Sequence, residues 1–496
     1  MKPGSCQVAA LILAGLLWLV MPGGCCRNSP EYCIERALVP VSAAPAHGPV
    51  VPTMEGVGLE MLQADYWLMG DDGADDLLIA SEEMGAYQEE LRKGSRGSLV
   101  DMANYPVEVP GSEVRRHIED WHPKPPKLYS QGVELGPEAI EGTRRNLNAA
   151  AVPETVVVRW GVVTRAAPLR GWPVTEGWFD APGDDEFDIM QGSVLDPGEP
   201  LALLHPSADG GWWFVRAGHS DGWVAAESVG VTSREVWNQF AAPGRFLVVT
   251  TSRLTTEQSR TVGPLQYRMG ARLPLWLEPW PERLGLRSTA GTWVVALPSR
   301  SADGALEVHP HSVPVSAGVT EGYLPYTRRN VLRLAFRMLG EPYGWGGLHG
   351  GEDCSYLVAM VYRCFGMFLP RNSWYQEQVP GRFWPLASGS LEELDVALSR
   401  VPAGASLHLK GHVMLYLGKR SGRHYVLHAL AAYGAGPGAR GYAGEAGAPL
   451  VAPAQKPKRI DVMRVVVSDL DLTRSNGLPL ALSVTVGKLF VFSKSP

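Results

Sequence analysis

The sequence predicts a multidomain protein made of a helical N-terminal region, two small β-barrels and a C-terminal α+β domain. With 496 residues the chain is long for a single hydrophobic core, so several domains are expected. Short β-rich runs separated by Gly and Asp turns fill residues 154–318, and apolar positions at helical spacing return after them. The 56 Gly, 40 Pro and 16 Trp indicate many turns and short strands rather than long helices.

Residues 1–26 have the pattern of a signal peptide for export. Lys2 precedes the apolar run of residues 8–21 (VAALILAGLLWLVM), which is shorter than the ~20 residues of a membrane-spanning helix. A buried helix of the mature fold is the alternative. We therefore expect an exported protein of the periplasm or cell envelope. Cys25 or Cys26 lies where a bacterial lipoprotein carries its lipid, which makes either one a candidate membrane anchor.

Residues 34–153 are expected to hold a Pro- and Ala-rich linker and then a mostly helical stabilising region without assigned chemistry. The formal charge of −6 offers no electrostatic argument for nucleic acid as a partner, so none is expected. Of the six cysteines, only Cys354 and Cys364 lie beyond residue 33, so the body of the chain is not a disulfide scaffold.

Two consecutive barrels are predicted for residues 154–235 and 240–318. The first range contains the runs TVVVRWGVV, PLALLH, WWFVRAG and GWVAAESV, and the second contains RFLVVTTSRL, ARLPLWLE and TWVVALPS. Strands of this length between Gly and Asp turns favour small barrels. The pair WW at residues 212–213 and the run GWV at residues 222–224 resemble the bacterial SH3-like domain.

The last predicted domain, residues 319–496, carries the candidate nucleophile. Apolar residues at helical spacing in 326–339 end at Gly340, and a Gly-rich loop leads to a second helix that begins at Cys354. A cysteine attacks as its thiolate, and the unpaired N–H groups at a helix start lower the pKa of a thiol placed there. Asp353 opposes thiolate formation unless its carboxylate turns toward a cation such as a substrate amine.

Two histidines on strand-like runs complete a candidate catalytic arrangement. If residues 418–422 close a hairpin symmetric about Arg420, His412 and His428 lie directly opposite each other, with Cβ atoms about 5 Å apart. Cys354 is then the nucleophile, and His412 is the general base that later protonates the leaving amine. His428 fixes the tautomer of His412.

Two other histidines offer alternatives. His349, in the Gly-rich loop, is a second candidate base, but it leaves the pairing of the other two histidines unexplained. His408 precedes His412 by four residues, as in some zinc sites. The segment predicts a strand and lacks the HExxH pattern, so neither a metal nor another cofactor is expected.

The combination of motifs resembles a known enzyme family. PYGWGG, DCSYLV, PRNSWYQ, GHVMLYLG and VLHA, within residues 341–430, look like the NlpC family of papain-like cell-wall endopeptidases. On the positions that match, the resemblance implies the catalytic triad Cys354, His412 and His428, with Tyr343 at the oxyanion site. It also implies a set of positions that bind the L-Ala-γ-D-Glu part of the substrate: Asp353, Ser355, Asn372 and Ser373.

The same resemblance implies the substrate and its selection. Family members with this architecture cleave the amide between γ-D-glutamate and the diamino acid of peptidoglycan stem peptides, and their first SH3-like domain restricts the cleft to peptides with a free N-terminal L-Ala. Asn372 falls where relatives often have aspartate, so recognition there loses a charge. Trp213 or Trp223 is a candidate contact from that domain, and a place in the barrel core is the alternative.

Two other functions fit the same residues. One is a cell-wall binding protein with a degenerate peptidase domain, and the other is an acyltransferase that passes the acyl group from the thiol to an amine instead of water. The sequence leaves open the oligomeric state and whether the third stem residue is diaminopimelate or lysine.

Overall fold

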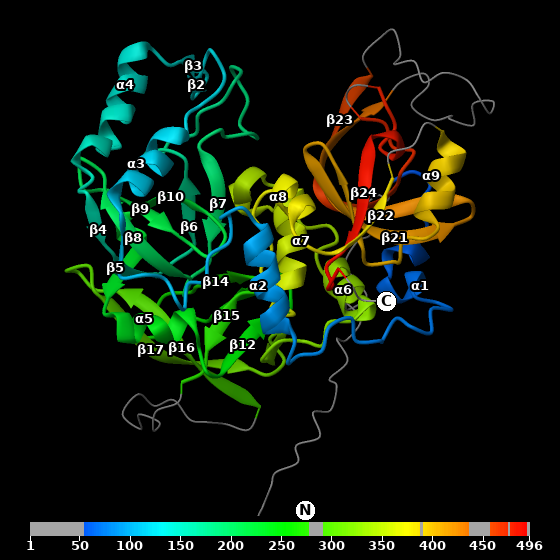
Figure 1. Ribbon diagram of the computed structural model, residues 1–496, viewed down its shortest axis with the longest axis horizontal. Coiled ribbons are helices and arrows are strands. Elements are labelled where there is room, and N and C mark those ends of the chain that lie inside the picture. The colour runs from blue at the N-terminus through cyan, green and yellow to red at the C-terminus, as the bar shows by residue number, and fades with distance from the viewer. Residues whose placement is uncertain (1–53, 277–290, 387–389, 436–456, 475–476, 494–496) are drawn as a thin grey trace, which may run out of the picture. The chain divides into compact units, whose positions relative to one another are not determined.

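The computed structural model describes residues 54–276, 291–386, 390–435, 457–474 and 477–493 (Figure 1). The expected signal peptide, the candidate lipid-anchor residues Cys25 and Cys26, and the first part of the expected linker lie outside these ranges. Within the described ranges, no helix combines the length and the apolar character needed to cross a membrane.

Residues 54–153 divide into two halves that pack against different domains. The first half packs against the C-terminal domain, where Tyr87 lies fully buried in the hydrophobic core. Asp65 accepts two hydrogen bonds of 3.0 Å from the Arg333 guanidinium, and the Tyr87 hydroxyl donates one of 2.9 Å to the carbonyl of Pro380. The helices of this half are η1 (Leu59–Leu62), α1 (Ala64–Trp67) and α2 (Met84–Gly94).

The second half packs against the β-rich residues that follow it. Val114 and Ile118, four positions apart on one face of a helix, lie in a core with Trp172 and Trp178. The N-terminal region therefore contacts both the first β-rich part of the chain and the C-terminal domain. The elements of this half are β1 (Glu108–Pro110), α3 (Gly111–Asp120), β2 (Tyr129–Ser130), β3 (Val133–Glu134), α4 (Pro137–Asn146) and η2 (Ala149–Ala151).

Residues 155–241 form what we call the first β domain. Its seven-stranded antiparallel sheet has the order β11-β5-β8-β9-β10-β6-β7, while β4 (Thr155–Val157) pairs with β1. Helix α5 (Arg234–Ala241) follows, and its Trp237 packs on Trp160 with ring centres 4.6 Å apart. The remaining elements are β5 (Arg159–Val163), β6 (Ala167–Arg170), β7 (Gln191–Leu195), β8 (Pro200–Pro206), β9 (Trp212–Arg216), β10 (Asp221–Ala225), η3 (Ala226–Ser228) and β11 (Val229–Thr232).

Residues 246–276 and 291–321 belong to the second β domain, and in these described residues three small antiparallel sheets surround one apolar core. Leu247, Val249 and Leu273 are fully buried in this core. In the first sheet, β12 (Phe246–Val249) pairs with both β15 (Arg272–Pro274) and β18 (Val319–Glu321). The other two sheets are the pairs β13 (Arg253–Thr255) with β14 (Gln266–Arg268), and β16 (Thr292–Arg300) with β17 (Leu306–Pro314).

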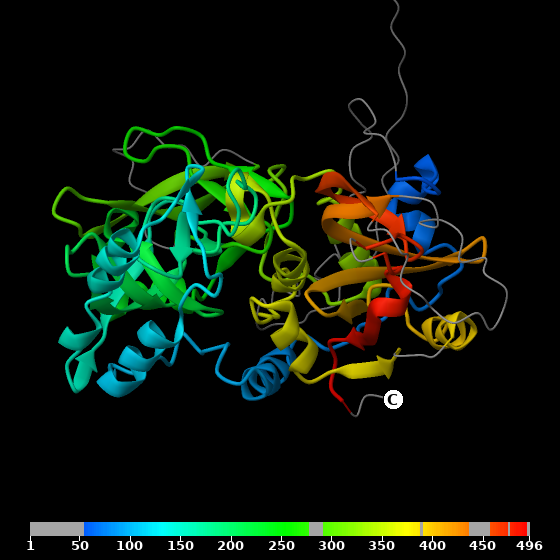
Figure 2. The ribbon, with the colours of Figure 1, turned by 90° about the horizontal axis from the view of Figure 1, so that it is seen from above.

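The C-terminal domain is built on a six-stranded antiparallel sheet, drawn mostly in orange and red in Figures 1 and 2. In sheet order its strands are β19 (Arg382–Pro385), β24 (Val484–Leu489), β20 (Ser406–Leu409), β21 (His412–Arg420), β22 (Arg423–Ala435) and β23 (Lys458–Asp469). The helices are α6 (Arg328–Phe336), η5 (Trp345–Gly350), α7 (Cys354–Arg363), α8 (Ser373–Gln378), α9 (Leu391–Leu398) and η6 (Ala481–Ser483).

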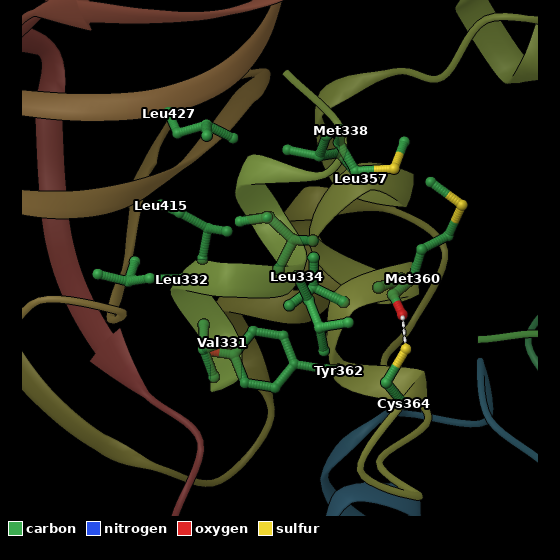
Figure 3. Packing of buried hydrophobic residues seen from close by; sticks show 14 of the residues in the cluster. Val331, Leu332, Leu334, Met338, Leu357, Met360, Tyr362, Cys364, Leu415 and Leu427 are labelled. Atoms are coloured by element: carbon green, nitrogen blue, oxygen red, sulfur yellow. Dashed lines mark hydrogen bonds between the residues drawn. The ribbon is translucent and has the colours of Figure 1, made fainter. Parts of the chain in front are cut away.

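Helices α6 and α7 pack against strands β21 and β22 (Figure 3). Val331 and Leu334 of α6 and Leu357 of α7 share a fully buried core with Leu415 and Leu427 of the sheet. Burying side chains of this size contributes about 1.5 to 3 kcal/mol each relative to exposure. The core therefore fixes the start of α7 relative to the start of β21.

Cys364 belongs to this core. Its side chain is fully buried, and its sulfur lies 3.6 Å from the carbonyl oxygen of Met360 (Figure 3). Burial raises the pKa of the Cys364 thiol to about 12, so the thiol is neutral and unreactive at physiological pH. Cys364 therefore serves packing, at the opposite end of α7 from Cys354.

Candidate active site

Cys354 is the first residue of α7, and Asp353 fixes where this helix begins. The Asp353 carboxylate accepts a hydrogen bond of 3.0 Å from the backbone N–H of Tyr356 and thereby caps the helix. The Cys354 side chain is 9% exposed, and the backbone N–H groups of Val413 and Ser355 hydrogen-bond toward its sulfur. The thiol therefore lies beside the first residues of β21.

His412 and His428 are joined by a hydrogen bond in the same place. His412 is the first residue of β21, directly before Val413, and its Nε2 lies 2.8 Å from Nδ1 of His428 on β22. The two rings meet at 62° with centres 5.1 Å apart. His428 is fully buried, and its Nε2 lies 3.0 Å from Oγ of Ser468 on β23. The hydrogen bond to His428 thus uses Nε2 of His412 and not Nδ1.

The predicted turn between these strands is wrong. Symmetry about Arg420 is expected from the sequence, whereas Ser421 and Gly422 form a two-residue turn with φ of 49° and 81°, and Arg420 pairs with Arg423. Two successive positive φ values are the pattern of a type I′ hairpin turn. If this register continued unbroken along the strands, the two histidines would lie on opposite faces of the sheet.

A β-bulge returns the two histidines to one face. Leu417 is an extra residue in β21, because Tyr416 pairs with Val426 whereas Gly418 pairs with Tyr425. After this shift the two histidines are diagonal neighbours rather than directly opposed, with Cα atoms roughly 7 to 8 Å apart. Imidazole rings are long enough to bridge that separation, which explains the hydrogen bond between them.

Both the thiol and its base are neutral in the resting site. Burial, together with the negative charge of Asp353, raises the pKa of Cys354 to about 12 and outweighs the nearby N–H groups. Burial and the positive charge of Arg474 lower the pKa of His412 to about 4, against the opposing charge of Asp353. Burial and Asp353 thus have a larger effect on the pKa of Cys354 than the helix start, which was expected to lower it.

Asp353 turns toward a cation supplied by the protein itself, Arg371. The guanidinium donates from Nη1 to Oδ1 at 3.1 Å and from Nη2 to Oδ2. The hydroxyl of Ser355 and the N–H of Gly346 donate to the same carboxylate at 2.9 and 3.1 Å. Although burial opposes ionisation, the charge of Arg371 holds the pKa of Asp353 below its usual range. The carboxylate is therefore ionised and saturated with donors.

Arg371 also connects the site to the first β domain. Its Nε donates a hydrogen bond of 3.1 Å to Oγ of Ser193 on β7, and its Nη1 donates one of 3.0 Å to Oγ of Ser355. The Ser355 hydroxyl thus accepts from Arg371 and donates to Asp353. Arg371 lies within the motif PRNSWYQ, but its contact with Ser193 could not be predicted from the sequence, because the two residues are 178 positions apart.

Asn372 and Ser373 begin helix α8 beside Arg371. Asn372 is exposed, and its Oδ1 accepts a hydrogen bond of 2.9 Å from the backbone N–H of Trp374, so it caps α8. An aspartate would cap the helix equally well. The amide at this position therefore changes the charge beside the site and preserves the local backbone.

Tyr343 lies near Cys354, at the entrance to the Gly-rich loop. Burial raises the pKa of the Tyr343 hydroxyl, and negative charge on Cys354 raises it further, so the hydroxyl stays protonated and able to donate. In the loop itself, Gly346 has a φ of 60°, and a Cβ there would lie 2.7 Å from the carbonyl oxygen of Gln191. Glycine therefore allows β7 of the first β domain to approach the catalytic loop closely.

The first β domain also brings an aromatic side chain to the site. Phe187 lies with its ring centre 6.4 Å from that of Tyr343 and 5.9 Å from that of Trp345. The preceding residue, Glu186, forms an ion pair of 2.8 Å with Arg459 on β23. This loop, residues 184–187, therefore contacts the C-terminal domain both at the Gly-rich loop and at β23.

The two tryptophans considered from sequence lie elsewhere. Trp223 is fully buried in the core of the first β domain, with its ring centre 5.5 Å from that of Phe214. Trp213 lies under the guanidinium of Arg159 at 4.9 Å. Phe187 is the residue that sequence analysis missed, because a single aromatic in a Gly- and Asp-rich loop carries no periodic signal.

The other two histidines have partners outside the triad. Nε2 of His349 lies 3.1 Å from the carbonyl oxygen of Asp185, and Nε2 of His408 lies 2.9 Å from Oγ of Ser406. In the part of the chain that the structure describes, no group of three or more His, Cys, Asp and Glu side chains is placed to hold a metal ion.

Comparison with known proteins identifies two domains. The NlpC/P60 family matches residues 340–434, and an SH3 domain of the SH3b1 type matches residues 178–225. Over 93 residues the chain is 32% identical to dipeptidyl-peptidase 6 of Lysinibacillus sphaericus, a match that covers 18% of this chain and 30% of that protein. The chain thus spans less than a third of the length of this relative.

Solved structures extend the likeness of the fold. An NlpC/P60 endopeptidase from Photobacterium damselae subsp. piscicida is similar with a TM-score of 0.65 and 16% identity, over 87% of this chain and 97% of that one. An NlpC/P60 family protein from Bacillus cereus reaches a TM-score of 0.38 at 16% identity, over 61% of this chain and 83% of its own. The first of these shows that most of the chain shares a known arrangement of domains.

Fold and site together define a domain of the cysteine-peptidase class, in which a helix presents a thiol to a histidine pair on a sheet. Within the C-terminal domain, residues 340–434 are similar to the NlpC/P60 family, and the match to an SH3b1-type domain at residues 178–225 precedes them.

Proposed function

We propose that this protein is an exported cysteine endopeptidase that cleaves the amide bond between γ-D-glutamate and the diamino acid of peptidoglycan stem peptides, with a preference for a free N-terminal L-Ala. The observation that carries the proposal is the hydrogen-bonded pair His412 and His428 beside the thiol of Cys354. A degenerate binding domain has no reason to retain a neutral thiol and a neutral base in this geometry.

The geometry supports the following sequence of bonds. As sulfur attacks the γ-carbonyl carbon of D-glutamate, the thiol proton passes to Nδ1 of His412 and the carbonyl oxygen becomes an oxyanion. The Tyr343 hydroxyl and the backbone N–H of Cys354, left without an internal partner at the helix start, stabilise that charge. His412 then protonates the leaving amine, and water hydrolyses the thioester to release the γ-carboxylate and the free thiol.

The contact between the first β domain and the catalytic loop supports the preference for a short N-terminal segment. The side chain of Arg371 donates a hydrogen bond to Ser193, and Phe187 packs beside Tyr343. The first β domain therefore covers the site on the side where Asp353 lies. We expect a wall at that position to admit two residues before the scissile bond and to exclude the glycan. The name of the relative, dipeptidyl-peptidase 6, is consistent with release of such a two-residue unit.

The test is digestion of synthetic L-Ala-γ-D-Glu-diaminopimelate-D-Ala, its lysine analogue and the same peptides carrying muramic acid, with products identified by mass spectrometry. We expect L-Ala-γ-D-Glu and the diamino acid dipeptide from the free peptides, and little product from the sugar-linked ones. Cleavage at another bond, or none by the wild-type protein, contradicts the proposal. An added amine acceptor that appears in the product would indicate acyl transfer instead of hydrolysis.

Export and lipid anchoring are part of the proposal and rest on the sequence of residues 1–26. The N-terminus of the mature protein, determined by mass spectrometry after expression in a Gram-negative host, tests this directly. Retention of Met1 would contradict export. Loss of metabolically incorporated fatty acid in Cys25→Ala or in Cys26→Ala would identify the anchored residue, and a mature protein without lipid would contradict the anchor.

A further inference from the structure

A chain of three hydrogen bonds begins at His412 and ends on a backbone carbonyl. Nε2 of His412 lies 2.8 Å from Nδ1 of His428, and Nε2 of His428 lies 3.0 Å from Oγ of Ser468. The Ser468 hydroxyl donates to the carbonyl oxygen of Asp469 at 3.2 Å. His428 and Ser468 are 0% and 1% exposed, so bulk solvent does not reach either partner.

The final acceptor determines the direction of the whole chain. A carbonyl oxygen only accepts, so the single hydrogen of the Ser468 hydroxyl points at Asp469. The same hydroxyl must then accept from Nε2–H of His428, which leaves Nδ1 of His428 without a proton. Nδ1 of His428 in turn accepts from Nε2–H of His412, and the unprotonated nitrogen of His412 is Nδ1.

The reverse arrangement disables the base. If Ser468 donated to His428, then His428 would carry its proton on Nδ1 and donate to Nε2 of His412. His412 would then be protonated on Nδ1, the nitrogen that must receive the thiol proton. This arrangement also loses the bond from Ser468 to the carbonyl of Asp469, and a buried group without its partner destabilises the state that contains it.

We propose that Ser468 is a positioning residue that sets the tautomers of both active-site histidines and so keeps Nδ1 of His412 free to accept the thiol proton. The inference rests on the proposed function for its effect on catalysis, whereas its effect on the tautomers is independent of any substrate. Ser468 touches neither Cys354 nor a substrate, and it acts only through His428.

The chain offers a matched control in Ser406. Its hydroxyl lies 2.9 Å from Nε2 of His408 and 3.2 Å from the carbonyl oxygen of Lys488, and its side chain is fully buried in the same sheet. Ser406→Ala therefore removes the same chemical group, from the same kind of contact, without touching the triad. Ser468→Thr retains the hydroxyl and serves as the conservative variant.

The first readout is the ring protonation of both histidines, from ¹⁵N chemical shifts of the imidazole nitrogens in the full-length Cys354→Ala protein. With Ser468 or Ser468→Thr, we expect the proton of each ring on Nε2. With Ser468→Ala, we expect the proton of each ring to move to Nδ1. Ser406→Ala should leave both rings unchanged. A proton on Nδ1 of His412 when Ser468 is present would overturn the proposal even if the alanine variant fails to fold.

The second readout is cleavage of the free stem peptide by variants that retain Cys354. We expect Ser468→Ala to lower kcat about five- to tenfold with KM nearly unchanged, as loss of one net hydrogen bond from the active tautomer implies. Ser468→Thr should recover most of this loss, and Ser406→Ala should show none. If Ser468→Ala leaves both the tautomers and kcat unchanged, Ser468 has no positioning role. If wild-type protein shows no cleavage, the proposed function fails, and the tautomer measurement still decides on Ser468.

Discussion

Two guanidinium nitrogens of Arg371 donate hydrogen bonds to the carboxylate of Asp353. Asp353 directly precedes Cys354, the first residue of α7. The two charges act in opposite directions on the thiol, because Asp353 raises the pKa of Cys354 and Arg371 lowers it. The same carboxylate caps the helix through the N–H of Tyr356. The pair therefore places an acid at the helix start without leaving an uncompensated charge beside the nucleophile.

Removing the guanidinium alone should destabilise the protein strongly. In Arg371→Met, the buried Asp353 carboxylate loses its counter-charge, and we expect the free energy of unfolding to fall by about 3 to 5 kcal/mol. The double variant Arg371→Met with Asp353→Asn should recover most of that loss. Denaturant unfolding measures both. Arg245→Met breaks an exposed pair with Glu321 and should cost about 1 kcal/mol or less. Equal losses for the two arginines would contradict this account.

The three residues of the triad should differ in how much activity they carry. Cys354→Ala should lower kcat/KM by ~10⁴-fold or more while the thermal midpoint stays close to that of the wild type. His412→Ala removes the base and should approach the same loss. His428→Ala leaves the base in place and should be at least about tenfold less damaging. Stem-peptide turnover measures all three, and significant cleavage by Cys354→Ala would reject the nucleophile.

The pH at which kcat/KM falls on the acidic side (the acidic limb of the profile) should lie well below the usual pKa of a histidine. Because burial and Arg474 lower the pKa of His412 to about 4, the imidazole stays unprotonated, and active as a base, down to that pH. Arg474→Gln removes a positive charge, raises the pKa of His412 and should move the limb of kcat/KM toward higher pH. Arg165→Gln, which breaks a pair with Glu227 in the first β domain, is the control. A limb near pH 6.5 in the wild type would contradict the shift.

Phe187 should control which substrates enter. Phe187→Ala removes the ring beside Tyr343 and Trp345, so we expect sugar-linked stem peptides to be cleaved several-fold better relative to free peptides. The ratio of the two kcat/KM values measures this selectivity. Trp213→Ala removes a half-buried aromatic that packs on Arg159 and should leave the ratio unchanged. If Trp213→Ala raised the ratio and Phe187→Ala did not, Trp213 would be the residue that excludes sugar-linked peptides.

The local features of the site could be predicted, whereas its long-range contacts could not. Cys354 at a helix start follows from helical spacing and a capping acid, and the two histidines on one face follow from the period of a strand. The predicted register is nevertheless wrong, because Gly418 and Gly422 allow a turn centred on Arg420 as well as one at Ser421 and Gly422, and no residue pattern marks the bulge. The shared face was still predicted correctly, because the register at the turn differs from the predicted one by three residues and the bulge shifts it back by one, which leaves an even offset of two.

Contacts between residues far apart in sequence escaped prediction for a different reason. Arg371 meets Ser193, and Phe187 meets Tyr343, across more than 150 residues in each case. No periodicity within one segment encodes such a meeting, since it depends on how whole domains pack. Trp223, one of the two candidate contacts, lies instead in the core of the first β domain, because apolar residues in a β-rich run usually belong to their own core.

The bulge at Leu417 limits how the length of this hairpin can change during evolution. A one-residue insertion or deletion between the hairpin turn and His412 would exchange the two faces of the strand, which separates the histidines and also turns core side chains outward. Length changes in this part of β21 are therefore tolerated only in steps of two. In related chains that keep the histidine pair, the number of residues between the hairpin turn and the first histidine should differ by an even number, or the bulge should lie at another position.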